Sequence, residues 1–217
     1  MKNISTSELE NSRGRRIFAD FLLNNFENKD LLQIFDKLTE LYIQVNSVIN
    51  ISALRNYDDI YIKHYLDSVY PYKYFDGECA DIGCGGGFPC IPLSIVTDLN
   101  FTGIESVGKK LTLIKRCVSE LNFKNINTEY SRSEDLAKNN VKFDTVCARA
   151  VADPDKSIKL CAPLTRSGGK IILYRTQNDE RASLSTETLC NVKLHNIVDY
   201  VLPETEIKRR LFIYAKE

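Results

Sequence analysis

The chain has 217 residues, and its 29 lysine and arginine residues balance its 29 aspartate and glutamate residues. This length suits one domain of ordinary size with an extension. A net charge of zero excludes attraction to nucleic acid by a global field, so any contact with RNA must use a local patch.

The seven cysteines form no Cys-x-x-Cys pair, and neither histidine has a cysteine at ligand spacing. We therefore expect reduced, mostly buried thiols and no metal site. No apolar stretch approaches membrane-spanning length, and the first residues lead into polar sequence rather than a signal core. These observations favour a cytoplasmic protein without membrane contact, and we expect it to be a monomer.

Residues 1–55 are predicted to form an N-terminal helical extension. Five side chains recur at steps of three and four, as on one face of a helix: Leu31, Phe35, Leu38, Tyr42 and Val45. A further helix is expected from Asp58 to Tyr70, because its acidic start suits the positive end of a helix and Pro71 follows its end. Residues 56–217 would form the second part, in one folding unit with the first.

Beyond this point strands alternate with helices, which predicts an α/β fold with a parallel sheet. Helices are expected at 91–95 and 109–121, and strands at 79–83, 101–105, 127–130, 143–147 and 170–174, the last after a turn at 167–169. Two further strands, at 192–202 and 210–214, predict an antiparallel hairpin that closes the sheet edge. The expected fold is therefore Rossmann-like, with helices on both faces of the sheet.

The most informative motif follows the first strand and reads Asp81-Ile82-Gly83-Cys84-Gly85-Gly86-Gly87. Glycine accepts positive φ and has no side chain, so such a loop turns sharply and lets a ligand touch its backbone. In a dinucleotide fingerprint the third glycine would fall on Phe88. The pattern here is typical of S-adenosylmethionine-dependent methyltransferases instead, and it predicts S-adenosylmethionine as the cofactor, bound at Asp81, Gly83 and Gly85. The alternative is a glycine turn with no ligand.

Glu105 ends the second predicted strand and is the candidate ribose ligand. A carboxylate can accept hydrogen bonds from both hydroxyls of a ribose diol. Doubly wound folds keep such an acid about twenty residues beyond the glycine loop. The alternative is an ordinary surface carboxylate.

Several segments in a fixed order carry a more specific similarity: Asn46, Asn50–Ser52, His64 with Asp67–Ser68, Asp81–Leu93, Glu105–Ser106 with Lys109–Lys110, Ser131–Glu134 and Arg149–Ala150. Over residues 30–177 the chain resembles the small-subunit ribosomal RNA guanine-N7 methyltransferases, also called the glucose-inhibited division protein B family. The resemblance implies an enzyme that methylates N7 of a guanine in 16S ribosomal RNA, as free RNA or within the small ribosomal subunit. It also implies that the cofactor contacts or borders Gly83, Phe88, Ser133, Glu134 and Arg149, and that residues 56–217 are the methyltransferase domain.

Two departures from the family pattern stand out. The family usually has tryptophan where this chain has Val45, and Lys-Gly where it has Arg175-Thr176. Arginine is not equivalent to lysine at a close contact, and threonine is stiffer than glycine. These changes leave the cofactor motifs intact and bear on the RNA target rather than on the reaction.

Guanine N7 carries a lone pair and no proton at neutral pH, so methylation there needs positioning rather than a general base. Arg149 and Arg175 end two strands at the ligand edge and are the candidate catalytic residues, together with His64. Arg149 could instead pair with Glu134 or Asp144 and only order its loop. His64 shares a helical face with Asp67 and Ser68, an arrangement unsuited to a catalytic triad, and would support the cofactor pocket or pack the helix.

Phosphate contacts could come from several basic side chains: Arg132, Arg149, Arg175, Lys208–Arg210, Arg13, Arg15 and Arg16, with Lys109–Lys110 a weaker candidate. Each cluster could equally be a solvated face. Two other functions remain open, namely a methyltransferase that acts on a small molecule or protein and a noncatalytic RNA-binding protein. The sequence has no Asn/Asp-Pro-Pro-Tyr/Phe motif of the kind used to methylate adenine amino groups, and no Pro-Cys pair for cytosine C5 chemistry.

Overall fold

A seven-stranded sheet forms the centre of the molecule in a computed structural model that describes residues 6–217. Its strands are β1 (Cys79–Ile82), β2 (Phe101–Glu105), β3 (Ile126–Tyr130), β4 (Phe143–Arg149), β5 (Thr165–Arg175), β6 (Val192–Val201) and β7 (Lys208–Lys216). The spatial order is β3-β2-β1-β4-β5-β7-β6, with β7 antiparallel to both of its neighbours and the other pairs parallel. The predicted parallel sheet with a terminal antiparallel hairpin is confirmed.

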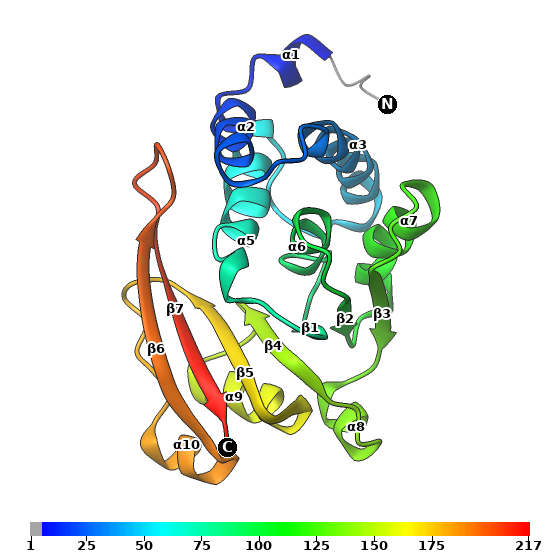
Figure 1. Ribbon diagram of the computed structural model, residues 1–217. Helices are drawn as coiled ribbons and strands as arrows, with labels where there is room; N and C mark the ends of the chain where they lie inside the picture. The colour runs from blue at the N-terminus through cyan, green and yellow to red at the C-terminus, as the bar shows by residue number, and fades with distance from the viewer. Residues whose placement is uncertain (1–5) are drawn as a thin grey trace.

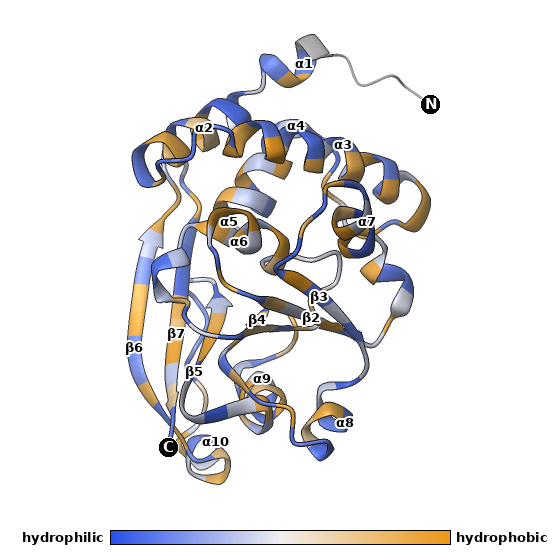
Figure 2. Ribbon diagram, turned by 45° about the vertical axis from the view of Figure 1, so that its right-hand side comes forward, coloured by the Kyte–Doolittle hydropathy of each residue, from blue (hydrophilic) through white to orange (hydrophobic). Residues whose placement is uncertain are grey.

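Helices cover the sheet in two layers (Figures 1 and 2). One layer contains α2 (Arg13–Asn25), α3 (Leu31–Ile49), α5 (Asp67–Val69), α6 (Cys90–Val96) and α7 (Thr112–Glu120). The other contains α8 (Ser133–Lys138), α9 (Pro154–Cys161) and α10 (Leu184–Cys190). Short elements complete the chain: α1 (Thr6–Glu10), α4 (Tyr57–Asp59), a π-helix η1 (Ile60–Leu66) and 3-10 turns η2 (Tyr72–Tyr74), η3 (Gly108–Leu111) and η4 (Ala162–Leu164).

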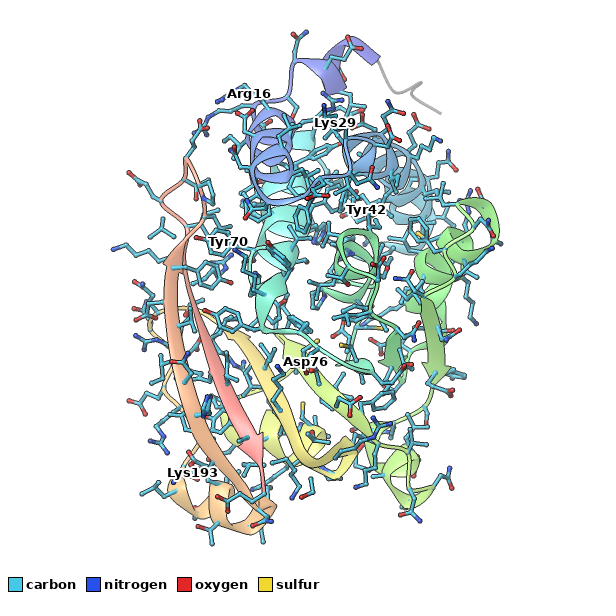
Figure 3. All side chains as sticks on the ribbon, viewed as in Figure 1. Arg16, Lys29, Tyr42, Tyr70, Asp76 and Lys193 are labelled. Atoms are coloured by element: carbon cyan, nitrogen blue, oxygen red, sulfur yellow. The ribbon has the colours of Figure 1, made fainter. Side chains whose placement is uncertain are left out.

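The N-terminal helices share one apolar core with the first layer and the sheet. All five side chains of the predicted α3 face are buried, and Tyr42 lies inside the helical layer in Figure 3. The core that holds them extends from Leu9 to Ile213. The predicted boundary between residues 55 and 56 stays a prediction, and residues 1–5 of the predicted extension lie outside the described part.

The helix expected at 58–70 is a continuous helical segment over α4, η1 and α5, with a π-helical middle. Asn56 caps it, since its side-chain oxygen accepts a hydrogen bond from the Asp59 amide at 2.8 Å. Asp58 accepts two hydrogen bonds from the start of α2, from Ser12 Oγ at 2.7 Å and from the Gly14 amide at 2.8 Å. These bonds hold the N-terminal extension against the segment that leads to the site.

The sequence prediction was wrong at the start of β5. The residues expected to form a turn, Ser167–Gly169, lie within the strand, which begins at Thr165. Pairing with β4 shifts register between Phe143 and Thr145, and a side chain on Gly169 would lie 2.6 Å from the Asp144 carbonyl oxygen. Glycine therefore permits a close approach of two strands here, rather than a turn.

The β6–β7 hairpin closes the sheet and reaches the N-terminal layer with its tip. Arg16 lies beside this tip in Figure 3 and pairs with Glu204 at 2.9 Å. Arg13 donates to the Glu204 carbonyl at 2.6 Å.

Six cysteines are buried free thiols and Cys190 is half-buried, as expected. Among residues 6–217, no helix is long and apolar enough to cross a membrane.

Candidate active site

Three candidate residues lie side by side at the carboxyl edge of the sheet. Ile82 of β1 pairs with Ile104 of β2 and with Ala148 of β4. The residues that follow them, Gly83, Glu105 and Arg149, therefore lie next to one another. This is the edge at which doubly wound sheets bind their ligands.

The glycine loop needs its glycines for two different reasons. Gly83, Gly85 and Gly87 have φ values of +66°, +55° and +97°, a region that side chains disfavour. At Gly83 an added Cβ would lie 2.9 Å from a Val151 methyl group, whereas at Gly85 it would meet nothing within 4 Å. The space above Gly85 is therefore open, as a loop that touches a ligand requires.

Glu105 is fixed against this loop. Its Oε2 accepts a hydrogen bond from the Gly85 amide at 3.1 Å, and its Oε1 accepts one from the Val107 amide at 2.9 Å. Lys110 Nζ lies 3.8 Å from Oε2. The carboxylate is only 6% exposed, so its direction is set by these contacts and it borders the open space above Gly85.

A pocket of about 250 Å³ opens beside Glu105. Gly83, Ser133 and Glu134 line it, and Ser133 Oγ donates to Glu134 Oε2 at 3.1 Å. Its further lining comes from Ile82, Ile104, Ser106, Ser131, Arg132, Val151, Lys156 and Leu160. The structure thus brings together four predicted cofactor residues from distant segments. Lys156 was missed because nothing in its local sequence marks it, whereas Ser106 could have been found from its place after the acid.

Asp81 lies beneath the loop and outside this pocket. It is 1% exposed, and its Oδ2 accepts a hydrogen bond from the Cys90 amide at 3.3 Å. Its Oδ1 is buried without a hydrogen-bond partner among the described residues. Burial raises the pKa of this carboxyl to about 7. Asp81 therefore supports the turn into α6, and a direct cofactor contact stays a prediction.

His64 and Phe88 form a stacked pair on the helical side of the loop. Their ring centroids are 4.1 Å apart with planes inclined by 8°. His64 Nε2 lies 3.1 Å from Ser52 Oγ and 3.3 Å from the Tyr42 hydroxyl, and its Nδ1 is buried without a partner among residues 6–217. Neither ring lines the pocket, so their predicted roles remain untested by this geometry.

Burial, and secondarily Arg149, lowers the pKa of His64 to about 3. In the unfolded chain the pKa of this histidine is near 6.5, so the unfolded state binds a proton at a higher pH than the folded state does. The free energy of unfolding therefore falls as the pH drops below 6.5. Between pH 6.5 and 5 we expect the free energy of unfolding to fall by about 2 kcal/mol more in the parent than in His64→Gln. Urea denaturation of both proteins at the two pH values measures this difference. Asp81 titrates in both proteins, so its contribution cancels in the difference between them. Equal pH dependence of the free energy of unfolding in the parent and in His64→Gln would contradict a buried neutral His64.

Arg149 is held by the helical segment above the sheet. It donates to Ser68 Oγ at 2.9 Å and to Asp67 Oδ2 at 3.0 Å, and also to the Lys63 carbonyl. Asp67 is 2% exposed and pairs a second time, with Arg209 of β7 at 3.0 Å. The ion-pair partners considered from the sequence, Glu134 and Asp144, were wrong. The buried carboxylate of Asp67 instead forms ion pairs with both Arg149 and Arg209.

The side chains of His64, Asp67 and Ser68 form no catalytic relay, as expected. Asp67 and Ser68 both contact Arg149, whereas the His64 ring faces Phe88. Ser68 Oγ donates to the His64 carbonyl and not to its ring. The shared helical face therefore positions Arg149 and supports no nucleophile.

Arg175 braces the loop after β4. Its guanidinium donates to the Ala152 carbonyl and to Ser157 Oγ, both at 2.6 Å, while Nε is buried without a partner in the described part. Burial lowers the pKa of this arginine. Thr176 bonds to Asp179 through its amide at 2.7 Å. A direct contact of Arg175 with RNA stays a prediction.

Most of the basic clusters proposed as phosphate contacts are already paired. Four arginines form ion pairs with acids, namely Arg15 with Asp36, Arg16 with Glu204, Arg209 with Asp67 and Arg210 with Asp199. Their charges are largely compensated. Arg132 and Lys109, in contrast, are exposed near the site.

Comparison with known proteins gives a consistent result. The family model for rRNA small subunit methyltransferase G matches residues 31–212. A ribosomal RNA small subunit methyltransferase G from Lachnoclostridium phytofermentans is 34% identical over 201 residues, which cover 87% of this chain and 83% of that protein. The Pseudothermotoga lettingae protein of the same name is 35% identical over 195 residues, covering 85% and 86%.

Solved structures share the fold at low sequence identity. A mutant of MtNAS in complex with S-adenosylmethionine has a TM-score of 0.56 at 14% identity and covers 94% of this chain and 88% of that one. TehB from Haemophilus influenzae has a TM-score of 0.52 at 14% identity, covering 74% and 66%. The match to the family model spans most of the chain and includes the glycine loop, Glu105 and Arg149. The chain therefore belongs to the rRNA small subunit methyltransferase G family.

Proposed function

We propose that this protein transfers a methyl group from S-adenosylmethionine to N7 of a guanine in 16S ribosomal RNA. Membership of the family supports methyl transfer as the reaction and ribosomal RNA as the substrate. The observation that supports S-adenosylmethionine as the cofactor is the open space above Gly85, which the fixed carboxylate of Glu105 borders. When bound, S-adenosylmethionine supplies a methyl group on a positively charged sulfur.

The residues of this chain fit such a ligand. Glu105 would accept hydrogen bonds from the ribose hydroxyls, and Ser133 and Glu134 would border the adenosine end of the pocket. Gly83 and Gly85 present backbone without a side chain to fill the site. Asp81, buried below, supports the loop from the protein side.

Among residues 6–217, His64 offers no available base at the loop, which agrees with N7 chemistry. His64 stays neutral at physiological pH, and its Nε2 is engaged with Ser52 and Tyr42. Because N7 has no proton to lose, the site must align the two reactants and exclude water. Arg149, next to Gly83 at the sheet edge, is the proposed positioning group on the substrate side. We further propose that the protein acts as a cytoplasmic monomer.

Glu105→Ala should bind S-adenosylmethionine at least about tenfold more weakly, because hydrogen bonds to a charged acceptor contribute roughly 1.5–3 kcal/mol. Calorimetry of both proteins measures the change. Glu105→Gln is the matched control: it keeps the shape and one acceptor oxygen, so it should retain an intermediate affinity. Equal affinity in the parent and Glu105→Ala would remove this residue from the site.

The function is tested by mapping N7-methylguanosine in 16S ribosomal RNA from cells with and without the gene. Loss of one modified position in the deletion strain, restored by the purified protein in vitro, is the expected result. Assays on naked RNA and on assembled small subunits identify the substrate form. Transfer to a small molecule or protein only, or RNA binding without transfer, would instead support one of the two alternatives left open by the sequence.

A further inference from the structure

We propose that Tyr130 is a stacking platform for an unpaired base that flanks the target guanine, with Lys109 and Arg132 contacting the adjoining phosphates. This inference rests on the proposed RNA substrate and extends it to a specific surface. The surface is named the β3 platform here and consists of Gly108, Lys109, Tyr130 and Arg132. Arg132 is the one member of this surface that also lines the cofactor pocket.

Tyr130 occupies a conspicuous position at the ligand edge. It is the last residue of β3 and pairs in register with Glu105, the proposed ribose ligand on the neighbouring strand. Its side chain is nevertheless 69% exposed, in a chain that buries most of its other large aromatic rings. Since adjacent strands are about 4.8 Å apart, β3 lies about 10 Å from β1 and its glycine loop. A base on Tyr130 would therefore be close to the reaction without occupying it.

The ring is supported from one side. A Cβ on Gly108 would lie 3.3–3.4 Å from three Tyr130 ring atoms, so the ring packs against the bare backbone of η3. This contact leaves the rest of the ring in solvent, and the phenol makes no hydrogen bond within residues 6–217. A ring held in place with an open surface is the arrangement on which nucleobases stack.

The Tyr130 ring lies outside the cofactor pocket. Side chains alternate along β3, so Tyr130 points to the same side of the sheet as Ile126, which belongs to the core under the N-terminal layer. The pocket is lined instead by Ile82 and Ile104, which belong to the core on the opposite face. Glu105 also lines the pocket and, as the register partner of Tyr130, projects to the same side of the sheet, so the Tyr130 ring lies beside the ribose end of the pocket. Tyr130 is not among the residues that line the pocket, and its exposed ring remains available to another ligand.

Charge favours RNA as that ligand. Lys109 follows Gly108, against which the ring packs, and Arg132 lies two residues after Tyr130. Both side chains are exposed, and neither forms an ion pair with any described residue. Arg15 and Arg16 of α2 and both arginines of β7 are paired with acids. In a chain with no net charge, these two unpaired cations beside an open aromatic ring match the phosphates and base of a single strand.

The test uses the full-length protein, small ribosomal subunits and S-adenosylmethionine. Tyr130→Ala should raise KM for the subunit at least about fivefold, and Tyr130→Phe should keep the parent value because it retains the ring. Calorimetric affinity for S-adenosylmethionine should stay unchanged in both. Leu189→Ala, which removes another exposed apolar side chain on the opposite layer, is the matched control and should change neither quantity. Lys109→Gln with Arg132→Gln should flatten the salt dependence of RNA binding.

The outcomes separate this proposal from the one on which it rests. Parent-like KM in Tyr130→Ala would overturn the platform while leaving the methyltransferase function intact. An equal loss of S-adenosylmethionine affinity would also overturn it, because the ring would then serve the cofactor. A parent protein that transfers no methyl group to the subunit would overturn the proposed function, and the platform with it.

Discussion

Gly85→Val should abolish S-adenosylmethionine binding in a protein that remains folded. Gly85 has a φ of +55°, which a β-branched residue disfavours, and the added side chain would enter the open space assigned to the ligand. We expect a loss of about 3 kcal/mol or more in binding free energy, roughly a hundredfold in affinity. Calorimetry measures the affinity, and circular dichroism shows whether the variant is folded.

The chain offers a close control for this substitution. Gly168 in β5 also has a positive φ, of +78°, and a Cβ there would also meet nothing within 4 Å. It lies near the start of β5, away from the carboxyl edge of the sheet. Gly168→Val therefore imposes a similar backbone strain without filling the site, and it should bind S-adenosylmethionine normally. A folded Gly85→Val with parent affinity would refute the assignment of the loop.

Arg149→Ala should reduce methyl transfer to ribosomal RNA by about a hundredfold, because a reaction that depends on alignment is sensitive to the loss of one positioning contact. The residue ends β4 next to Gly83 and is fixed by Ser68 and Asp67. Tritium transfer to small subunits measures the rate. Since RNA attraction comes from local cations in a neutral protein, the parent rate should also fall as salt rises.

Arg209→Ala separates this effect from simple loss of stability. Both arginines pair with the buried Asp67 carboxylate, so removing either leaves that carboxylate with fewer partners and should lower the free energy of unfolding by about 1–3 kcal/mol. Arg149 lies next to Gly83 on the strand beside β1, whereas Arg209 lies on β7, two strands further along the sheet. If the two variants lose stability and methyl transfer in the same proportion, Arg149 has a structural role only.

Local sequence determined the strands, the glycine loop and the acid that faces it. Glycine at positive φ and an acid about twenty residues later are short-range patterns, and in the structure the Gly85 amide donates to Glu105. The amphipathic face of α3 was predictable because nineteen residues give the helical period several repeats. Helices α8, α9 and α10 have six to eight residues each and were not predicted, since so few turns establish no period.

Tertiary structure alone decided which charged side chains are unpaired and which side chains contact one another. Asp67 pairs with arginines 82 and 142 residues away in the chain, and no local pattern connects them. The same holds for the stacking of His64 on Phe88, and for the ion pairs that neutralise Arg16 and Arg210. Long-range contacts of this kind depend on how the hairpin and the N-terminal helices close over the sheet. Tyr130 lies on β3, at the edge of the sheet opposite the hairpin, and is left exposed there. The sequence shows Tyr130, Lys109 and Arg132 only as three separate residues.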